Sequence, residues 1–150
     1  MKHLAVVCTG IFVSLLPSYS RATLGEAIDS PTKNLSTIKA AQKVSSEEKY
    51  TVHEYEKNGN LVREYASASG VVFAVGWNGI SKPDLNALFG SYYTEYRQAF
   101  DHVPKQYGVK SLSLKTTKMV IRRGGRMRDQ RGFVYIPSLV PGGVNVEELK

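Results

Sequence analysis

The hydrophobic pattern is most regular around Asn58-Gly59, which separates two runs of strand-forming residues. Residues 50–57 and 61–66 are rich in Tyr, Val, Thr and Leu, interspersed with charged side chains. Such runs are typical of strands with one exposed face, and Asn-Gly between two strands is the strongest short-range hairpin signal. The pattern therefore predicts a β-hairpin with Asn58 and Gly59 as its turn.

The charges of this hairpin also predict its register. With a two-residue turn, counting back along both strands places Glu54 opposite Arg63 and His53 opposite Glu64. Opposite charges directly across a ladder stabilise strand pairing, so both pairs favour this register.

A continuous apolar run follows at residues 71–77. A run without alternation indicates a strand that is buried on both faces, at the centre of a sheet. Together with the hairpin, it predicts a three-stranded antiparallel meander.

The clearest helical pattern begins after Ser81, Pro83 and Asp84, which have the chemistry of a helix N-terminus. Apolar side chains then recur at helical spacing, with polar residues opposite them. The stripe consists of Leu85, Leu88, Phe89, Tyr92, Tyr96, Ala99 and Phe100. We expect a helix that ends near Pro104 and covers one face of the sheet.

Shorter strand signals follow in the C-terminal third, and Gly124-Gly125 marks a second expected hairpin turn. The expected strands lie around Leu112 and Leu114, at 118–123, at 126–129 and at 133–136. The order of elements predicts an α+β fold. It has an antiparallel β-meander and C-terminal hairpin strands, with one main amphipathic helix packed on the sheet.

We expect residues 50–150 to form a single α+β domain. Residues 23–49 are polar and rich in Ser, Thr, Lys and Ala. They are expected to form a flexible leader, in which residues 37–44 could form a short helix.

The first 22 residues have the pattern of a secretory signal peptide. A basic start is followed by an apolar run at residues 4–16, which is too short to cross a bilayer core of roughly 30 Å. Ser20 and Ala22 fit the small-x-small rule for cleavage before Thr23, with cleavage after Ser20 as the second choice. We therefore expect a periplasmic or secreted protein, with the signal peptide cleaved near Ala22.

Charge is distributed unevenly beyond this segment. Residues 23–104 hold eight Lys or Arg and ten Asp or Glu, whereas residues 105–150 hold ten and three. The positive excess favours an anionic partner, although it also serves solubility. Outside the cytoplasm we expect no nucleic acid; lipid headgroups, lipopolysaccharide, acidic glycans or an acidic protein fit that compartment.

Few residues support metal or cofactor chemistry. Beyond the expected cleavage site the chain has two histidines, His53 and His102, and its only cysteine, Cys8, lies inside the apolar run. A zinc or copper site would need carboxylates from scattered positions, so we expect no metal and no cofactor. The glycine-rich stretches lack the spacing of a phosphate-binding loop.

His53 and Glu64 are the candidate catalytic residues. A carboxylate beside an imidazole favours the charged form of the ring and orients it, as a general base requires. Tyr55, Phe73 and Val75 are expected on the same face of the sheet. The alternative is an ordinary cross-strand ion pair, because structural pairs also perturb pKa values.

Arg123, Arg126 and Arg128 are the candidate ligand-binding residues. With Gly124-Gly125 as the turn, Arg123 faces Arg126, and Met127 supplies a core contact. Like charges facing each other destabilise a strand pair slightly, and an anion held between two guanidinium groups would reverse that effect. The alternative is a hairpin tip that is simply solvated.

Several short motifs occur in a characteristic order. They are Arg63-Glu-Tyr65, Gly70-Val-Val-Phe-Ala-Val-Gly-Trp77, Pro83-Asp-Leu85, Leu88-Phe-Gly-Ser-Tyr92, Gly124-Gly-Arg-Met127 and Tyr135-Ile-Pro-Ser-Leu139. Together they resemble the bacterial domain of unknown function 2844, over roughly residues 50–141. The resemblance implies a small exported protein of Gram-negative bacteria, and it implies no activity, cofactor or catalytic residue.

These observations favour a non-enzymatic binding or envelope-associated module that contacts an anionic partner through its basic C-terminal hairpin. One alternative is a small hydrolase or lyase that uses His53 and Glu64. Another is a structural component of the envelope.

Overall fold

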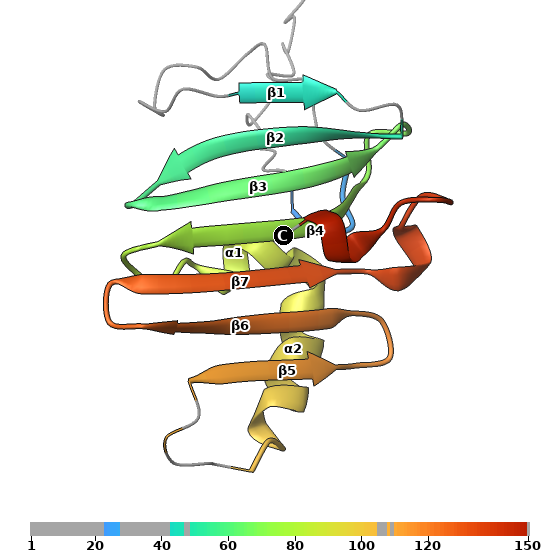
Figure 1. Cartoon of the computed structure of the whole chain (residues 1–150). Helices are drawn as coiled ribbons and strands as arrows, with labels where there is room; N and C mark the ends of the chain where they lie inside the picture. The colour runs from blue at the N-terminus through green and yellow to red at the C-terminus, as the bar shows by residue number, and fades with distance from the viewer. Residues whose placement is uncertain (1–22, 28–42, 47–48, 105–107, 109, 150) are drawn as a thin grey trace, which may run out of the picture.

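The computed structural model describes residues 23–27, 43–46, 49–104, 108 and 110–149. These residues form a seven-stranded antiparallel sheet in the order β1-β2-β3-β4-β7-β6-β5, with the helices behind one face (Figure 1). The predicted α+β class is therefore confirmed. None of the helices in the described ranges has the length and apolar character that a membrane span requires.

The first half of the sheet is a meander of neighbouring strands. Its members are β1 (Lys43–Ser46), β2 (Tyr50–Lys57), β3 (Asn60–Ser67) and β4 (Val72–Gly79). The β2–β3 hairpin has the predicted register, with Glu54 opposite Arg63 and His53 opposite Glu64. Asn58 and Gly59 have φ values of 53° and 73°, and a two-residue turn with positive φ at both positions matches the twist of the strands.

The second half is another meander, which consists of β5 (Ser111–Lys115), β6 (Val120–Arg126) and β7 (Asp129–Tyr135). The expected strand around Leu112 and Leu114 is confirmed as β5. β7 pairs with β4, so it joins the two meanders at the centre of the sheet (Figure 1).

The predicted turn of the second hairpin is wrong. Gly124 and Gly125 lie inside β6, and the chain turns at Met127 and Arg128, with φ of 63° at Arg128. This register places Ile121 opposite Val134 in the core and Arg126 opposite Asp129. Apolar pairs and an opposite-charge pair across the ladder stabilise it more than two facing arginines would.

Gly124 and Gly125 allow neighbouring backbone segments to approach β6 closely, and they do not form a turn. A Cβ on Gly125 would lie 2.1 Å from the Asp129 carbonyl oxygen, and its φ of 143° is a conformation that other residues rarely adopt. A Cβ on Gly124 would lie 3.3 Å from the Lys110 carbonyl oxygen. The glycines therefore allow neighbouring backbones to pack tightly against the end of β6.

The predicted helix is present but interrupted. It consists of α1 (Leu85–Phe89), the 3₁₀ turn η1 (Gly90–Tyr92) and α2 (Tyr93–Asp101). Asp84 caps α1 by accepting hydrogen bonds from the backbone N–H groups of Asn86 and Ala87 at 3.1 and 3.2 Å. Gly90, with φ of 51°, ends α1, so the apolar stripe is retained while the helix is not continuous.

Two clusters of apolar side chains pack on opposite faces of the sheet. The helix-side cluster contains Val75 and Trp77 with Leu88, Phe89 and others, and the cluster on the opposite face contains Tyr65, Phe73 and Leu149. Phe73 was predicted on the face of His53 and lies on the other face. A β-bulge pairs Tyr65 with Ala74 and Ala66 with Val72, which leaves Phe73 as the extra residue and reverses the alternation.

Parts of the expected leader belong to this folded unit. Leu24 is fully buried in the helix-side cluster, and β1 pairs with β2 along its whole length. Lys43 and Val44, which the possible short helix included, are therefore in a strand, whereas residues 37–42 lie outside the described residues.

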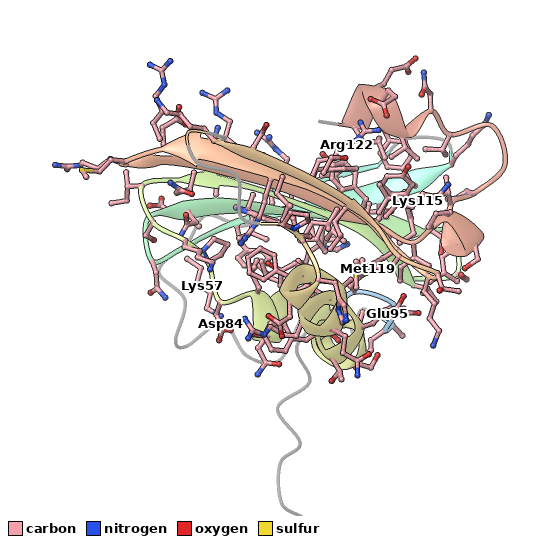
Figure 2. The ribbon with its side chains drawn as sticks, turned by 90° about the horizontal axis from the view of Figure 1, so that it is seen from below. Lys57, Asp84, Glu95, Lys115, Met119 and Arg122 are labelled. Atoms are coloured by element: carbon pink, nitrogen blue, oxygen red, sulfur yellow. The ribbon has the colours of Figure 1, made fainter. Side chains whose placement is uncertain are left out.

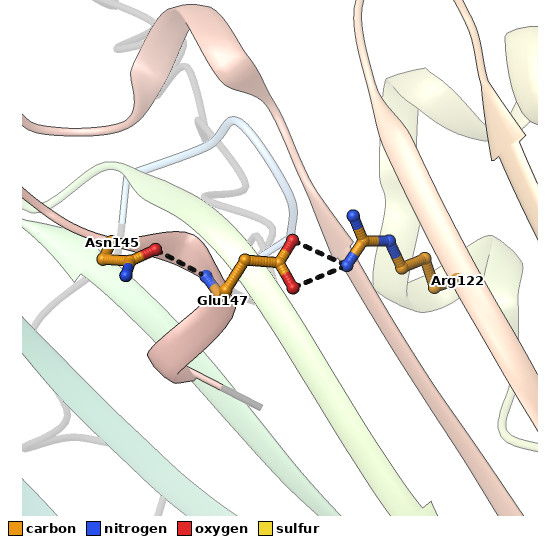
Figure 3. A network of polar contacts seen from close by, with 3 residues as sticks. All are labelled: Arg122, Asn145 and Glu147. Carbon is orange, nitrogen blue, oxygen red and sulfur yellow. Dashed lines mark hydrogen bonds and ion pairs between the residues drawn. The ribbon is translucent and has the colours of Figure 1, made fainter.

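The C-terminal tail, residues 140–149, covers part of the face opposite the helices. It follows η2 (Pro137–Leu139) and ends in η3 (Val146–Leu149), where Leu149 is buried and accepts a hydrogen bond on its carbonyl from the Tyr65 hydroxyl. Figure 2 shows Arg122 on this face and Met119 on the helix side. In Figure 3 one guanidinium nitrogen of Arg122 donates to both carboxylate oxygens of Glu147, at 2.7 and 2.9 Å.

Candidate functional site

One row of residues crosses the C-terminal half of the sheet on the helix side. Strand pairing places Leu112 of β5 opposite Arg123 of β6, Arg123 opposite Gly132 of β7, and Gly132 opposite Trp77 of β4. Residues that are directly paired point to the same face, so this row lies beneath the helices. In this row the charged side chain of Arg123 lies between the apolar side chains of Leu112 and Trp77.

Gly132 makes room for the Trp77 ring within this row. A Cβ on Gly132 would lie 2.0 Å from the indole, closer than any side chain could approach. The ring therefore lies over the β7 backbone and fills the gap between its own strand and Arg123.

The guanidinium group of Arg123 stacks on aromatic rings of α2. Its central carbon lies 4.7 Å from the centroid of the Phe100 ring and 5.8 Å from that of Tyr96. A guanidinium over an aromatic face is attracted by the ring quadrupole, so α2 fixes its position. Burial also raises the pKa of the Tyr96 hydroxyl, an effect that the nearby Arg123 charge opposes.

A groove of about 750 Å³ opens along this row, between the C-terminal end of α2, the start of β5 and the end of β6. We call it the Arg123 groove. Its apolar wall consists of Trp77, Leu85, Phe100, Val103 and Leu112, and its charged side chains include Lys82, Lys110, Arg123 and Asp101. Asp101 forms an ion pair with Arg97 at 3.6 Å, so cations dominate the groove.

The hairpin tip presents a separate basic surface. Arg126, Met127 and Arg128, which we call the arginine tip, are all exposed, and the Met127 side chain is 92% exposed. Met127 was predicted to contact the core, and its position in the turn makes that prediction wrong. The side chains of Arg126 and Arg128 make no hydrogen bond or ion pair with any residue that the structure describes.

The three predicted ligand-binding arginines are therefore divided. Arg123 points to the helix side, whereas Arg126 and Arg128 stand at the end of the hairpin (the left of the β6–β7 pair in Figure 1). Arg123 and Arg126 do not face each other, so they cannot hold an anion between them as the sequence predicted.

Glu64 is a buried carboxyl group at the centre of β3, only 5% exposed. The Tyr55 hydroxyl donates a hydrogen bond to its Oε1 atom at 2.7 Å. Burial raises the pKa of Glu64 from 4.5 to about 7, although the Tyr55 hydrogen bond and the Lys57 charge oppose the shift. A carboxyl group with such a pKa can exchange a proton near neutral pH.

His53 lies directly opposite Glu64, as predicted, but its electrostatics differ from the prediction. Burial lowers the pKa of His53 below its usual 6.5, whereas the neighbouring carboxylate was expected to favour the charged ring. Because Glu64 ionises at about pH 7, each group is largely neutral where the other is charged. The two side chains are thus neighbours without forming an ion pair.

Within the described residues, no three His, Cys, Asp or Glu side chains come together in a way that could hold a metal ion. Lys82, Lys110 and Phe100, which line the groove together with Arg123, were not predicted as site residues. They come from three segments that only the tertiary fold brings together. The helical pattern predicted Phe100 as a core residue, and no local pattern marks any of the three as a groove residue.

The comparisons with known proteins identify the family. The family described as protein of unknown function (DUF2844) matches residues 20–149. The chain belongs to the DUF2844 family. No curated protein and no solved structure matches the chain. The family match spans the whole sheet, the Arg123 groove and the arginine tip, so both basic surfaces lie within the DUF2844 domain.

Proposed function

We propose that this DUF2844 protein is an exported binding module that contacts an anionic lipid surface through its arginine tip. The observation that carries the proposal is an exposed methionine between two exposed arginines at the end of a hairpin. Arginine donates paired N–H groups to phosphate, and the methionine side chain can enter the apolar boundary beneath the headgroups.

The exposed apolar side chain favours lipid over the other anionic partners considered. Arg126 and Arg128 alone would suit an acidic glycan or an acidic protein equally well. Met127, at 92% exposure, would stay in water against a highly charged surface, whereas burial in a bilayer removes its apolar surface from water.

Export is the other half of the proposal, and its support is the pattern of residues 1–22. The basic start, the short apolar run and the Ser20-x-Ala22 site fit a cleavable signal, which would place the protein in the periplasm or outside the cell. N-terminal sequencing of the protein from its host's envelope or medium should begin near Thr23. An intact Met1 on cytoplasmic protein would contradict export.

Liposome co-sedimentation tests the lipid contact. The wild type should bind vesicles that contain phosphatidylglycerol more tightly than vesicles of phosphatidylcholine alone, and the binding should weaken as salt rises because exposed charges are screened. Arg126→Ser combined with Arg128→Ser should abolish the preference. Met127→Ser should weaken binding to both kinds of vesicle.

A matched control separates the tip from net charge. Lys115→Ser combined with Lys118→Ser removes two exposed cations away from the tip, and this variant should bind like the wild type. If both double variants lose binding equally, the overall charge and not the tip governs the contact. If the wild type ignores anionic vesicles at low salt, the lipid proposal is wrong.

Acid–base chemistry at Glu64 is the second candidate function, favoured by the pKa of about 7 of this carboxyl group. It would make the protein a small hydrolase or lyase. Hydrolysis of 4-nitrophenyl acetate offers a direct probe: both His53→Ala and Glu64→Gln should abolish any turnover while each variant still unfolds in a cooperative thermal melt. Turnover that survives both substitutions would place the chemistry elsewhere.

A further inference from the structure

We propose that the Arg123 groove binds a small amphipathic carboxylate, with Arg123 binding the carboxylate and the apolar wall binding the rest of the ligand. This site is separate from the arginine tip. It goes beyond the proposed lipid contact and does not depend on it.

Arg123 is positioned before any ligand arrives. Strand β6 holds its backbone, and the rings of Phe100 and Tyr96 hold its guanidinium group at 4.7 and 5.8 Å. The side chain is partly buried, yet it makes no hydrogen bond or ion pair with any described residue. A guanidinium group has five N–H donors in a planar fork that matches a carboxylate, and a fork already fixed by stacking loses little entropy on binding.

The other charges around the groove favour an anion. Lys82 and Lys110 lie at its rim, and the carboxylate of Asp101 is already paired with Arg97 at 3.6 Å. Arg131, which also lines the groove, donates to Asp129 at 3.0 Å, so its charge is satisfied. Among the residues that the structure describes, the unpaired positive charge of the groove is thus concentrated on Arg123 and the two lysines.

The wall of the groove indicates that the anion carries an apolar part. Leu112 lies directly across from Arg123, and the Trp77 ring lies on the other side of it, over Gly132. A volume of about 750 Å³ is within the usual range for a small-molecule site. A single carboxylate suits this environment better than a dianion, because the second charge would lose hydration against apolar side chains.

Titration calorimetry with three probes tests the proposal. Octanoate carries both a carboxylate and an apolar chain, 1-octanol carries the chain alone, and acetate carries the charge alone. Octanoate should bind at least about tenfold more tightly than either of the others, because only octanoate uses both parts of the site.

Two variants with one matched control assign the binding to the groove. Arg123→Met keeps an apolar stem over Phe100 without its donors, and octanoate affinity should fall about tenfold or more. Lys115→Met removes an exposed cation that lies outside both the groove and the arginine tip, and this variant should bind octanoate like the wild type. Leu112→Trp fills the groove and should also block octanoate while Arg123 is retained, which covers the case in which Arg123→Met does not fold.

Several results would overturn the proposal. They are a wild type that does not bind octanoate at millimolar concentration, an Arg123→Met variant that binds as the wild type does, and 1-octanol or acetate binding as tightly as octanoate. Equal loss in Lys115→Met would show attraction by net charge instead of a groove. Vesicle binding by the arginine tip is measured in a separate experiment, so a negative result for one site leaves the proposal for the other site unaffected.

Discussion

The backbone N–H of Leu24 donates a hydrogen bond to the carbonyl oxygen of Leu88 at 3.1 Å, where the helix is interrupted. Carbonyl groups in the last turn of a helix lack an intrahelical partner, so the end of α1 offers this acceptor to an incoming segment. The Leu24 side chain is fully buried beside it. The interruption of the helix is thus the feature that lets the N-terminal segment join the core.

Gly90 makes this interruption possible, and Gly90→Ala tests it. Its φ is +51°, and a Cβ there would lie 2.9 Å from the Thr23 Oγ1 atom. Backbone strain and this contact together should lower the free energy of unfolding by about 3 kcal/mol. Gly70→Ala is the control, because Gly70 has φ of +80° with nothing within 4 Å, so it should lose only about 1 kcal/mol.

Urea unfolding followed by circular dichroism measures both variants. Thr23→Gly should recover part of the loss in the Gly90→Ala background and none in the Gly70→Ala background. If the two alanine variants are equally destabilised, the N-terminal segment does not press against Gly90.

The β2–β3 hairpin could be predicted from sequence because all its determinants are local. Asn58 and Gly59 adopt the turn they favour, and the facing charges of Glu54 and Arg63 meet at 2.6 Å. The strand after it was also predicted, but the bulge at Phe73 was not. A bulge changes which residues reach the core without changing the composition of the run, so the run itself contains no signal for it.

The turn of the β6–β7 hairpin was predicted wrongly because glycine is favoured both in tight turns and where two backbones approach closely. Gly124-Gly125 has the residues of a turn, but both glycines lie where backbones approach closely, and at Gly125 a side chain would not fit. The turn instead contains Arg128 with positive φ, which is uncommon for such a residue. The Arg123 groove depends on this register and on the helix position, so local patterns could indicate its arginine but not its neighbours.

Glu64 should make stability fall as pH rises. Its pKa is raised from 4.5 to about 7 in the folded protein, so the folded state retains a proton that the unfolded state has lost. The free energy of unfolding should therefore decrease between about pH 4.5 and 7, by roughly 3 kcal/mol at most. Glu64→Gln should match the wild type near pH 4.5 and be more stable above pH 7.

The pH dependence of the wild type must be compared with that of Glu64→Gln, because His53 changes the stability in the opposite direction as pH rises. The pKa of His53 is lower in the folded protein than its usual 6.5, so the unfolded state binds a proton more readily than the folded state. The contribution of His53 to the free energy of unfolding therefore increases as pH rises through this range. Glu56→Gln removes a carboxyl group at an exposed position on β2 and is the matched control for the loss of a glutamate. A Glu64→Gln profile parallel to that of the wild type would show that Glu64 is not buried as described.

The C-terminal tail should be held by apolar burial more than by its ion pair. Leu149 is 6% exposed, so Leu149→Ala should cost about 2 to 4 kcal/mol. Arg122 and Glu147 are 41% and 54% exposed at their side chains, and an exposed pair contributes at most about 1 kcal/mol. Arg122→Gln should therefore cost much less than Leu149→Ala in a denaturant melt, and the reverse order would show that the tail docks through charge.

The stability of arginine variants distinguishes the observed hairpin register from the one that places Arg123 opposite Arg126. In the structure Arg123 faces Gly132 and stacks on Phe100, whereas Arg126 faces Asp129 from the exposed end of the strand. Arg123→Ser should lose about 1 kcal/mol of stability with its cation–π contact, and Arg126→Ser should change stability by at most about 0.5 kcal/mol.

The double variant decides between the registers. Side chains on opposite faces of a strand do not interact directly, so the two effects should add to within about 0.5 kcal/mol. Facing arginines would repel each other, and either single substitution would then relieve that repulsion and stabilise the hairpin. A double-mutant cycle from urea unfolding at low and high salt measures the coupling. A salt-dependent coupling, with Arg123→Ser more stable than the wild type, would contradict the observed register and the groove built on it.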